Sequence, residues 1–122
     1  MRKIFFALVF TVTFLLNAPT EAQDIWIATN GDGSDWYVVD ETIEGDDTGK
    51  FRWTNAEFKL VERDGSVKIV SWNFTQTKPD GGRLANWVYE VDYGDGKKYT
   101  ENVLTGTNAE KFLIYCLKYL GL

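Results

Sequence analysis

Five polar, glycine-centred segments divide this chain, and they limit its possible folds more than any other feature. The runs between them are short and rich in β-branched and aromatic residues, which is typical of β-strands. Connections this short join antiparallel neighbours, because a parallel pair needs a long crossover. We therefore expect a meander sheet. The five segments are NGDGSD (30–35), EGDDTGK (44–50), RDGS (63–66), KPDGGR (78–83) and YGDGKK (93–98).

The runs between the turns predict a sheet of five or six strands. The Asp-Gly pairs Asp64-Gly65 and Asp95-Gly96 are good hairpin signals, and we expect each pair to form a two-residue hairpin loop with both residues at positive φ. Alternation assigns side chains to the two faces of each strand. The candidate strands are 24–29, 35–43, 50–62, 66–77, 83–93 and 97–103.

The end of the chain changes from strand to helix periodicity. Apolar residues recur there at i, i+3, i+4, i+7, i+8 and i+11, which predicts one amphipathic helix within 109–122. Thr107 and Glu110 fit a capping box at its start, and Gly121 suits its C-terminal cap. The apolar stripe consists of Ala109, Phe112, Leu113, Cys116, Leu117 and Leu120.

Cys116 is the single cysteine of the chain, and its position within the apolar stripe predicts a packing role. A thiol buried among aliphatic side chains has a raised pKa and is inert. The sequence contains no histidine that could activate it. An intermolecular disulfide and a catalytic thiol are the two less favoured alternatives.

The first 22 residues have the pattern of a secretory signal peptide. Arg2 and Lys3 precede a 13-residue run, Ile4–Leu16, that is broken only by two threonines, and Ala22 suits a cleavage site. Removal of 1–22 would leave 23–122, which has the size of one α+β domain. We expect the protein to be exported to the periplasm, the cell surface or the medium, with no membrane insertion after cleavage.

The charge and the missing residue types restrict the function. The chain has 13 basic and 18 acidic residues, and loss of Arg2, Lys3 and Glu21 leaves 11 and 17, a net charge of −6. An acidic protein is a poor ligand for nucleic acid or anionic membrane. The absence of histidine excludes Ser-His and Cys-His catalysis and His-bound metals. No cofactor or metal motif is present, so we expect a protein without enzymatic activity.

One terminal helix is too small to cover the whole predicted sheet. A 14-residue helix is about 21 Å long and about 10 Å wide, whereas six strands span roughly 29 Å. Either the sheet curls around the helix, or its second face meets a partner or a second copy of the chain. Trp72 and Trp87 fit the core. The candidate partner-binding residues are Trp36, Tyr37 and Trp53 from the strands, with Asp46 and Asp47 from an acidic turn.

One segment resembles a known family. The stretch IWIATNGDGSDWYVVDETI (25–43) is similar to the start of the surface-adhesin protein E family, and the order continues through FRW (51–53), WVYEVDY (87–93) and the closing helix. That resemblance implies an antiparallel sheet with a C-terminal helix, export from a bacterial cell and, for some members, binding of host proteins. This chain lacks the family's lipoprotein cysteine at the mature start and a second cysteine.

These observations lead to three functional hypotheses. The first is an exported, adhesin-like binding module of the bacterial envelope that recognises a protein partner through sheet aromatics. The second is a periplasmic or secreted inhibitor or accessory protein that inserts acidic loops into a basic cleft. The third is a small hydrolase that uses carboxylates alone, with Asp40, Glu41 or Glu90 beside a concave pocket.

Overall fold

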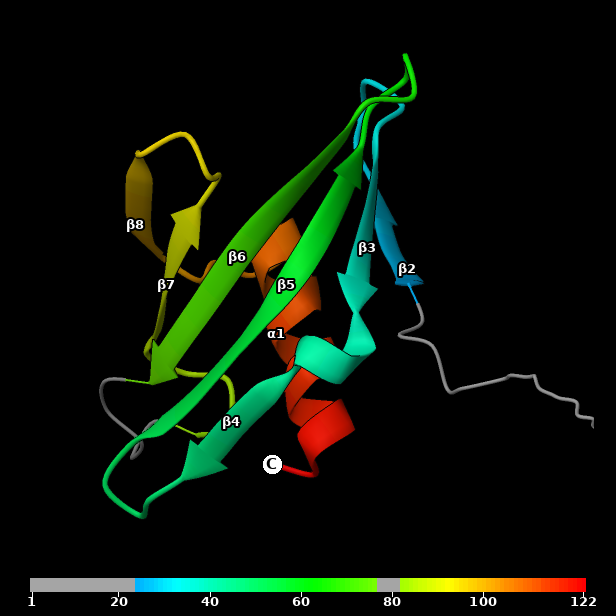
Figure 1. Ribbon diagram of the computed structural model, residues 1–122. Helices are drawn as coiled ribbons and strands as arrows, with labels where there is room; N and C mark the ends of the chain where they lie inside the picture. Colours follow the sequence, from blue (N-terminus) through cyan, green and yellow to red (C-terminus); the bar gives the residue numbers. More distant parts are fainter. Residues whose placement is uncertain (1–23, 77–81) are drawn as a thin grey trace, which may run out of the picture.

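The computed structural model describes residues 24–76 and 82–122. Within these residues, seven strands form one open antiparallel sheet and a single α-helix packs on one face of it (Figure 1). The predicted signal peptide lies outside the described residues. The elements are β2 (Asp24–Thr29), β3 (Asp35–Val39), the 3-10 helix η1 (Asp40–Thr42), β4 (Glu44–Asp47), β5 (Arg52–Val61), β6 (Val67–Gln76), β7 (Trp87–Asp92), β8 (Lys98–Asn102) and α1 (Asn108–Leu120).

The sheet confirms the predicted α+β meander. Its strands follow the order β2-β3-β5-β6-β7-β8, and β4 pairs with β5 beside β3. The sheet is not closed, so β2 and β8 are its two ends. In Figure 1 the helix lies behind the middle of the sheet, with β2 on one side and β7 and β8 on the other.

The structure divides the predicted strand 35–43 into two parts, which raises the number of strands to seven. β3 ends at Val39, and β4 begins at Glu44 on the same edge of β5. Five residues separate Val38 from Glu44, whereas two separate their partners Phe58 and Asn55. The extra residues form η1, where the Thr42 hydroxyl donates to the Val39 carbonyl at 2.6 Å. A bulge of this kind allows both strands to pair with β5.

The turns that contain Asp64-Gly65 and Asp95-Gly96 are longer than predicted. In the β5–β6 hairpin the Glu62 N–H bonds the Ser66 carbonyl at 2.8 Å, so the loop has three residues and Gly65 has φ of 90°. Asp64 is not at positive φ; its carboxylate instead accepts from the Ser66 N–H at 2.9 Å. The β7–β8 turn is also longer, because Asp92 pairs with Lys98. The prediction of two-residue loops was therefore wrong for both turns.

The helix α1 has the predicted buried stripe and caps. The Thr107 hydroxyl accepts from the Glu110 N–H at 3.4 Å, and the Glu110 carboxylate accepts from the Gly106 N–H at 3.0 Å. Gly121 ends the helix at φ of 73°, a conformation that glycine adopts without strain. The buried helix residues are Ala109, Phe112, Leu113, Cys116 and Leu117.

The core lies between α1 and the helix-facing side of the sheet. Phe112 stacks on Phe58 of β5 with a centroid distance of 4.4 Å and meets the edge of Trp72 of β6 at 4.9 Å. Trp72 and Trp87 are both buried, as predicted. α1 packs mainly against β5, β2 and β4, so the same face of the sheet continues beyond the helix over β7 and β8.

No helix in the described part of the chain is long and apolar enough to span a membrane.

Candidate functional site

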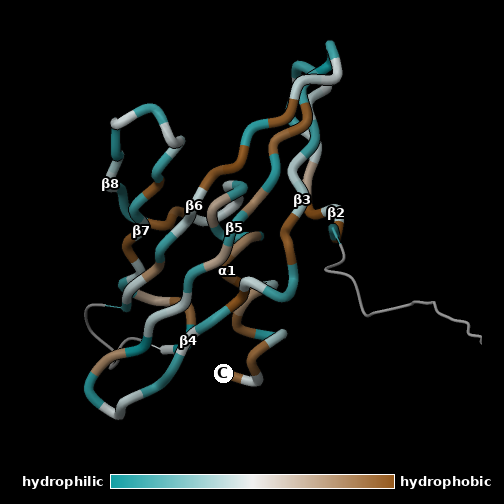
Figure 2. Tube along the Cα trace, in the orientation of Figure 1, coloured by the Kyte–Doolittle hydropathy of each residue, from teal (hydrophilic) through white to brown (hydrophobic). Residues whose placement is uncertain are grey.

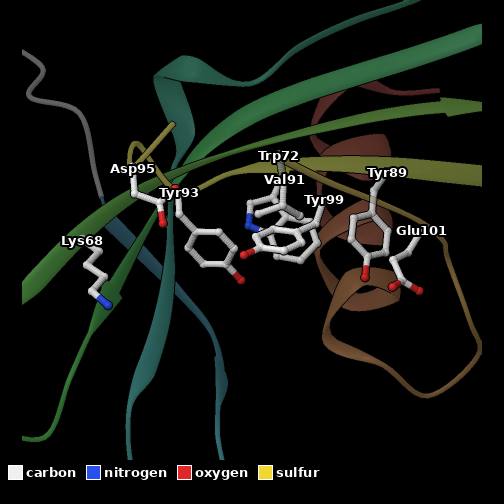
Figure 3. Close-up of a pocket in the computed structure, with 8 residues that line it drawn as sticks. All are labelled: Lys68, Trp72, Tyr89, Val91, Tyr93, Asp95, Tyr99 and Glu101. Carbon is white, nitrogen blue, oxygen red and sulfur yellow. The ribbon is translucent and has the colours of Figure 1, made fainter. Parts of the chain in front are cut away.

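The part of the sheet face that extends beyond α1 forms an aromatic hollow of about 520 Å³ over β6, β7 and β8 (Figure 3). We call this hollow the tyrosine groove. Its lining combines aromatic rings with charged groups, a composition that suits ligand binding. The lining residues are Lys68, Trp72, Tyr89, Val91, Tyr93, Asp95, Tyr99 and Glu101.

Strand register brings these residues together. Val91 of β7 lies between Trp72 of β6 and Tyr99 of β8, so the three side chains form one row across the sheet. Tyr89 is opposite Glu101, and this pair begins the next row. Because side chains two residues apart share a face, each strand contributes alternate residues to the groove.

The aromatic rings are arranged in two contacting pairs. The centroids of Trp72 and Tyr89 are 4.9 Å apart and their planes are tilted by 35°. The centroids of Tyr93 and Tyr99 are 5.9 Å apart, with an edge-to-face angle of 77°. Figure 3 shows both pairs and the charged side chains at the two ends of the groove. Aromatic pairs of this kind contribute about 0.5–1.5 kcal/mol beyond the area they bury.

The indole N–H of Trp72 lacks a hydrogen-bond partner among the described residues. Trp72 is 6% exposed, and its Nε1 atom is buried without an acceptor. In Figure 3 this nitrogen lies on the side of the ring nearer Tyr93. An unpaired buried donor costs about 1–3 kcal/mol, so a ligand that brought an acceptor to this atom would regain part of that energy.

The hydroxyls of Tyr89 and Tyr93 remain protonated at neutral pH. Burial raises the pKa of Tyr89, and the Glu101 carboxylate raises it further. Burial, followed by the proximity of Tyr99, raises the pKa of Tyr93. Lys68 forms an ion pair with Glu62 at 3.2 Å. The groove therefore offers neutral hydroxyls that can donate or accept hydrogen bonds, with two carboxylates and one ammonium group nearby.

A second hollow, on the opposite face of the sheet, is acidic. Its volume is about 630 Å³, and we call it the acidic hollow. It provides the concave pocket near Glu41 and Glu90 that the carboxylate-hydrolase hypothesis requires. In the described part of the chain, no group of acidic side chains is arranged to hold a metal ion. The charged lining residues are Glu41, Glu44, Glu57, Glu90, Asp92 and Lys98.

Trp36 does not lie on a binding surface, and this corrects its assignment as a partner-binding residue. It is 5% exposed and packs against Phe112 and Trp72 with centroid distances of 5.2 and 5.9 Å. Its register partner is Leu60 of β5, on the helix-facing side of the sheet. The alternation of β3 could not show this, because both of its faces carry apolar residues.

Tyr37, Trp53 and Asp46 lie on the opposite face of the sheet, at two separate positions. Trp53 pairs there with Asp46, whereas Asp47 pairs with Arg52 on the helix-facing side and forms an ion pair with it at 3.2 Å. Tyr37 pairs instead with Lys59, six residues along β5 from Trp53 and so roughly 20 Å away.

The acidic residues also differ from their prediction as loop groups. Asp46 and Asp47 belong to strand β4. The Asp46 carboxylate accepts from the Asp47 N–H, and the Asp47 carboxylate accepts from the Gly49 N–H, at 2.8 and 2.9 Å. Both carboxylates therefore accept hydrogen bonds within the β4–β5 turn. The predicted binding residues do not come together in one site.

The sequence reasoning did not identify the groove residues as a site. Tyr89 and Tyr93 alternate along the chain with Trp87 and Val91 on one strand face, but the sequence does not show which of them the helix covers. The available signal was the surplus of aromatic residues on 87–93 together with Tyr99 on the next strand. Because the helix is too short to cover the whole sheet, some of these aromatic side chains remain uncovered.

Cys116 lies in the core, as predicted. It is a free cysteine, fully buried, and burial raises the pKa of its thiol to about 12, although a hydrogen bond with Thr54 acts in the opposite direction. A thiol in this environment is not a nucleophile at neutral pH.

Comparison of the chain with known protein families, with curated proteins and with solved structures finds no match.

Proposed function

We propose that this protein is an exported, non-enzymatic binding module of the bacterial cell envelope that recognises a protein partner through the tyrosine groove. The observation that supports this proposal most strongly is the groove itself, with its paired aromatic rings and the unpartnered Trp72 N–H. Export rests on the predicted signal peptide. The adhesin-like role rests on the resemblance to the surface-adhesin protein E family.

Aromatic rings held on a sheet favour protein recognition. Tyrosine and tryptophan are enriched among the residues that dominate binding energy, because they bury a large area with little loss of conformational entropy. Tyr99 is 50% exposed and lies in the groove, so it has surface left to bury. The open, concave shape suits a projecting segment of a partner.

The test compares two tyrosines that are equally exposed. Tyr99 lies in the groove, whereas Tyr119, also 50% exposed, lies on α1 outside it. A partner is first captured from envelope extract with the mature domain, identified and purified. Its affinity for wild type, Tyr99→Ala and Tyr119→Ala is then measured by calorimetry.

We expect Tyr99→Ala to weaken binding by about 30-fold, which corresponds to about 2 kcal/mol for a central interface tyrosine. Tyr119→Ala should bind like wild type. Circular dichroism verifies that both variants are folded. Equal affinity of all three folded proteins would contradict the proposal.

The acidic hollow supports a second candidate, an inhibitor or accessory protein that binds a basic surface. Five carboxylates and one lysine line this hollow. Charge reversal at Glu90 and Asp92 would abolish such binding, and Tyr99→Ala would leave it unchanged. Turnover of a glycoside by the purified protein, lost on Glu90→Gln, would favour the hydrolase instead.

A further inference from the structure

Among the residues that the structure describes, no strand pairs with the outer edge of β8. This strand ends the sheet, and all five of its residues are exposed. The Val103 N–H donates to the Trp87 carbonyl at 2.9 Å. Because backbone groups alternate in direction along a strand, the N–H and C=O groups of Tyr99 and Glu101 also point toward β7. Those of Lys98, Thr100 and Asn102 therefore point away from the sheet.

The side chains of β8 border both hollows. Tyr99 and Glu101 line the tyrosine groove on one face, and Lys98 lines the acidic hollow on the other. A strand added to β8 would direct successive side chains alternately toward the two hollows. The edge and the groove therefore form one continuous surface, and Figure 2 shows that β8 is largely hydrophilic.

The charge around this edge is negative. The groove contributes two carboxylates and the acidic hollow five, seven in total, whereas each contributes one lysine. Lys97, in the adjoining turn, adds a third cation. Opposite charge on a partner accelerates association and favours the correct pairing.

We propose that β8 accepts an extended, basic segment of the partner protein as an added antiparallel strand, with one of its long basic side chains entering the tyrosine groove near Glu101. This inference rests on the proposed function and names the element that the groove recognises. Strand addition supplies main-chain hydrogen bonds, and the pockets beside the strand supply specificity. A cationic side chain among tyrosine rings gains a cation–π contribution.

A basic segment fits this edge better than a second copy of the chain. Residues 23–122 carry a net charge of −6, so two copies repel each other. The lysines at the turn are also a common protection of edge strands against self-association.

Thr100→Pro is the decisive variant. Its N–H points away from β7, so proline removes a donor from the free edge without removing a bond from the sheet. Thr100→Val is the matched control, because it keeps the N–H and suits a strand. Both variants should fold like wild type.

The probe is an acetylated and amidated hexapeptide of alternating lysine and threonine, titrated into the labelled mature domain and followed by amide NMR. We expect the Lys98, Thr100 and Asn102 amides to shift and to become protected from exchange. Thr100→Pro should lower the association constant at least tenfold, and Thr100→Val should not change it. A peptide in which glutamate replaces lysine should not bind.

Three results would overturn the inference: no binding of the lysine peptide to wild type, equal binding by Thr100→Pro, or a concentration-dependent dimer in gel filtration that Thr100→Pro dissociates. Binding of the captured partner to the two variants distinguishes failure of this inference from failure of the proposed function. If Tyr99→Ala weakens capture and Thr100→Pro does not, the groove binds but no strand is added. If neither variant weakens capture, the proposed function is wrong.

Discussion

Replacing Trp36 by alanine should remove a large part of the stability of the fold. The side chain is 5% exposed and contacts the rings of Phe112 and Trp72 edge-to-face. Truncation of a buried tryptophan costs about 3–5 kcal/mol, because the transfer energy is lost and a cavity remains. A domain of this size has a total stability of about 5–15 kcal/mol.

The same loss can be expressed as a change in melting temperature. A domain of about 100 residues melts about 4–8 °C lower for each kcal/mol, so Trp36→Ala should lower Tm by roughly 12–40 °C. Trp36→Phe keeps an aromatic ring against Phe112 and should lose about half as much. The intermediate variant keeps the prediction measurable if the alanine variant is unfolded at room temperature.

The assay is guanidinium unfolding followed by far-UV circular dichroism. Trp26→Ala is the control, because Trp26 is 57% exposed and donates one hydrogen bond to the Thr29 hydroxyl. It should lose less than about 1 kcal/mol. If Trp36→Ala lost no more stability than Trp26→Ala, the tryptophan would not be part of the core, and its assignment as a surface residue would be correct after all.

The remaining predictions concern the thiol and the helix cap. Thiol labelling of native protein at pH 8 should be negligible at Cys116 and rapid in denaturant; rapid labelling without denaturant would contradict its burial. Because the pKa of Cys116 is about 12 in the folded chain against 9.0 for the free thiol, the unfolded state ionises first, and the free energy of unfolding should fall between pH 9 and 12. Cys116→Val should show a smaller fall. Thr107→Ala should lower the free energy of unfolding by about 0.5–2 kcal/mol in a thermal unfolding experiment, because the Glu110 N–H loses its hydrogen-bond acceptor. Thr107→Ser keeps a hydroxyl at this position and should therefore retain most of the wild-type stability.

Local patterns predicted the elements that depend on neighbouring residues. The stripe around Cys116 and the Thr107 cap involve contacts within four residues along a helix, and both occur in the structure. The predicted core positions of Trp72 and Trp87 were also correct, since both side chains are buried.

The binding residues were harder to predict from the sequence, because the exposure of a side chain depends on elements that are distant in the chain. Trp36 and Tyr37 are adjacent and both aromatic, yet only Trp36 lies under α1. The division of 35–43 depends on β5, where the Glu57 N–H donates to the Thr42 hydroxyl at 2.9 Å. Because Glu57 lies outside 35–43, no sequence pattern within that stretch could predict this contact.

The sequence by itself determined an antiparallel sheet, a capped C-terminal helix and a buried, inert thiol, because turn chemistry and periodicity act over a few residues. Only the tertiary structure decided which aromatic residues lie under α1 and which remain open beside β8. That division depends on where one short helix settles on a wide sheet, and the area it leaves uncovered is the tyrosine groove.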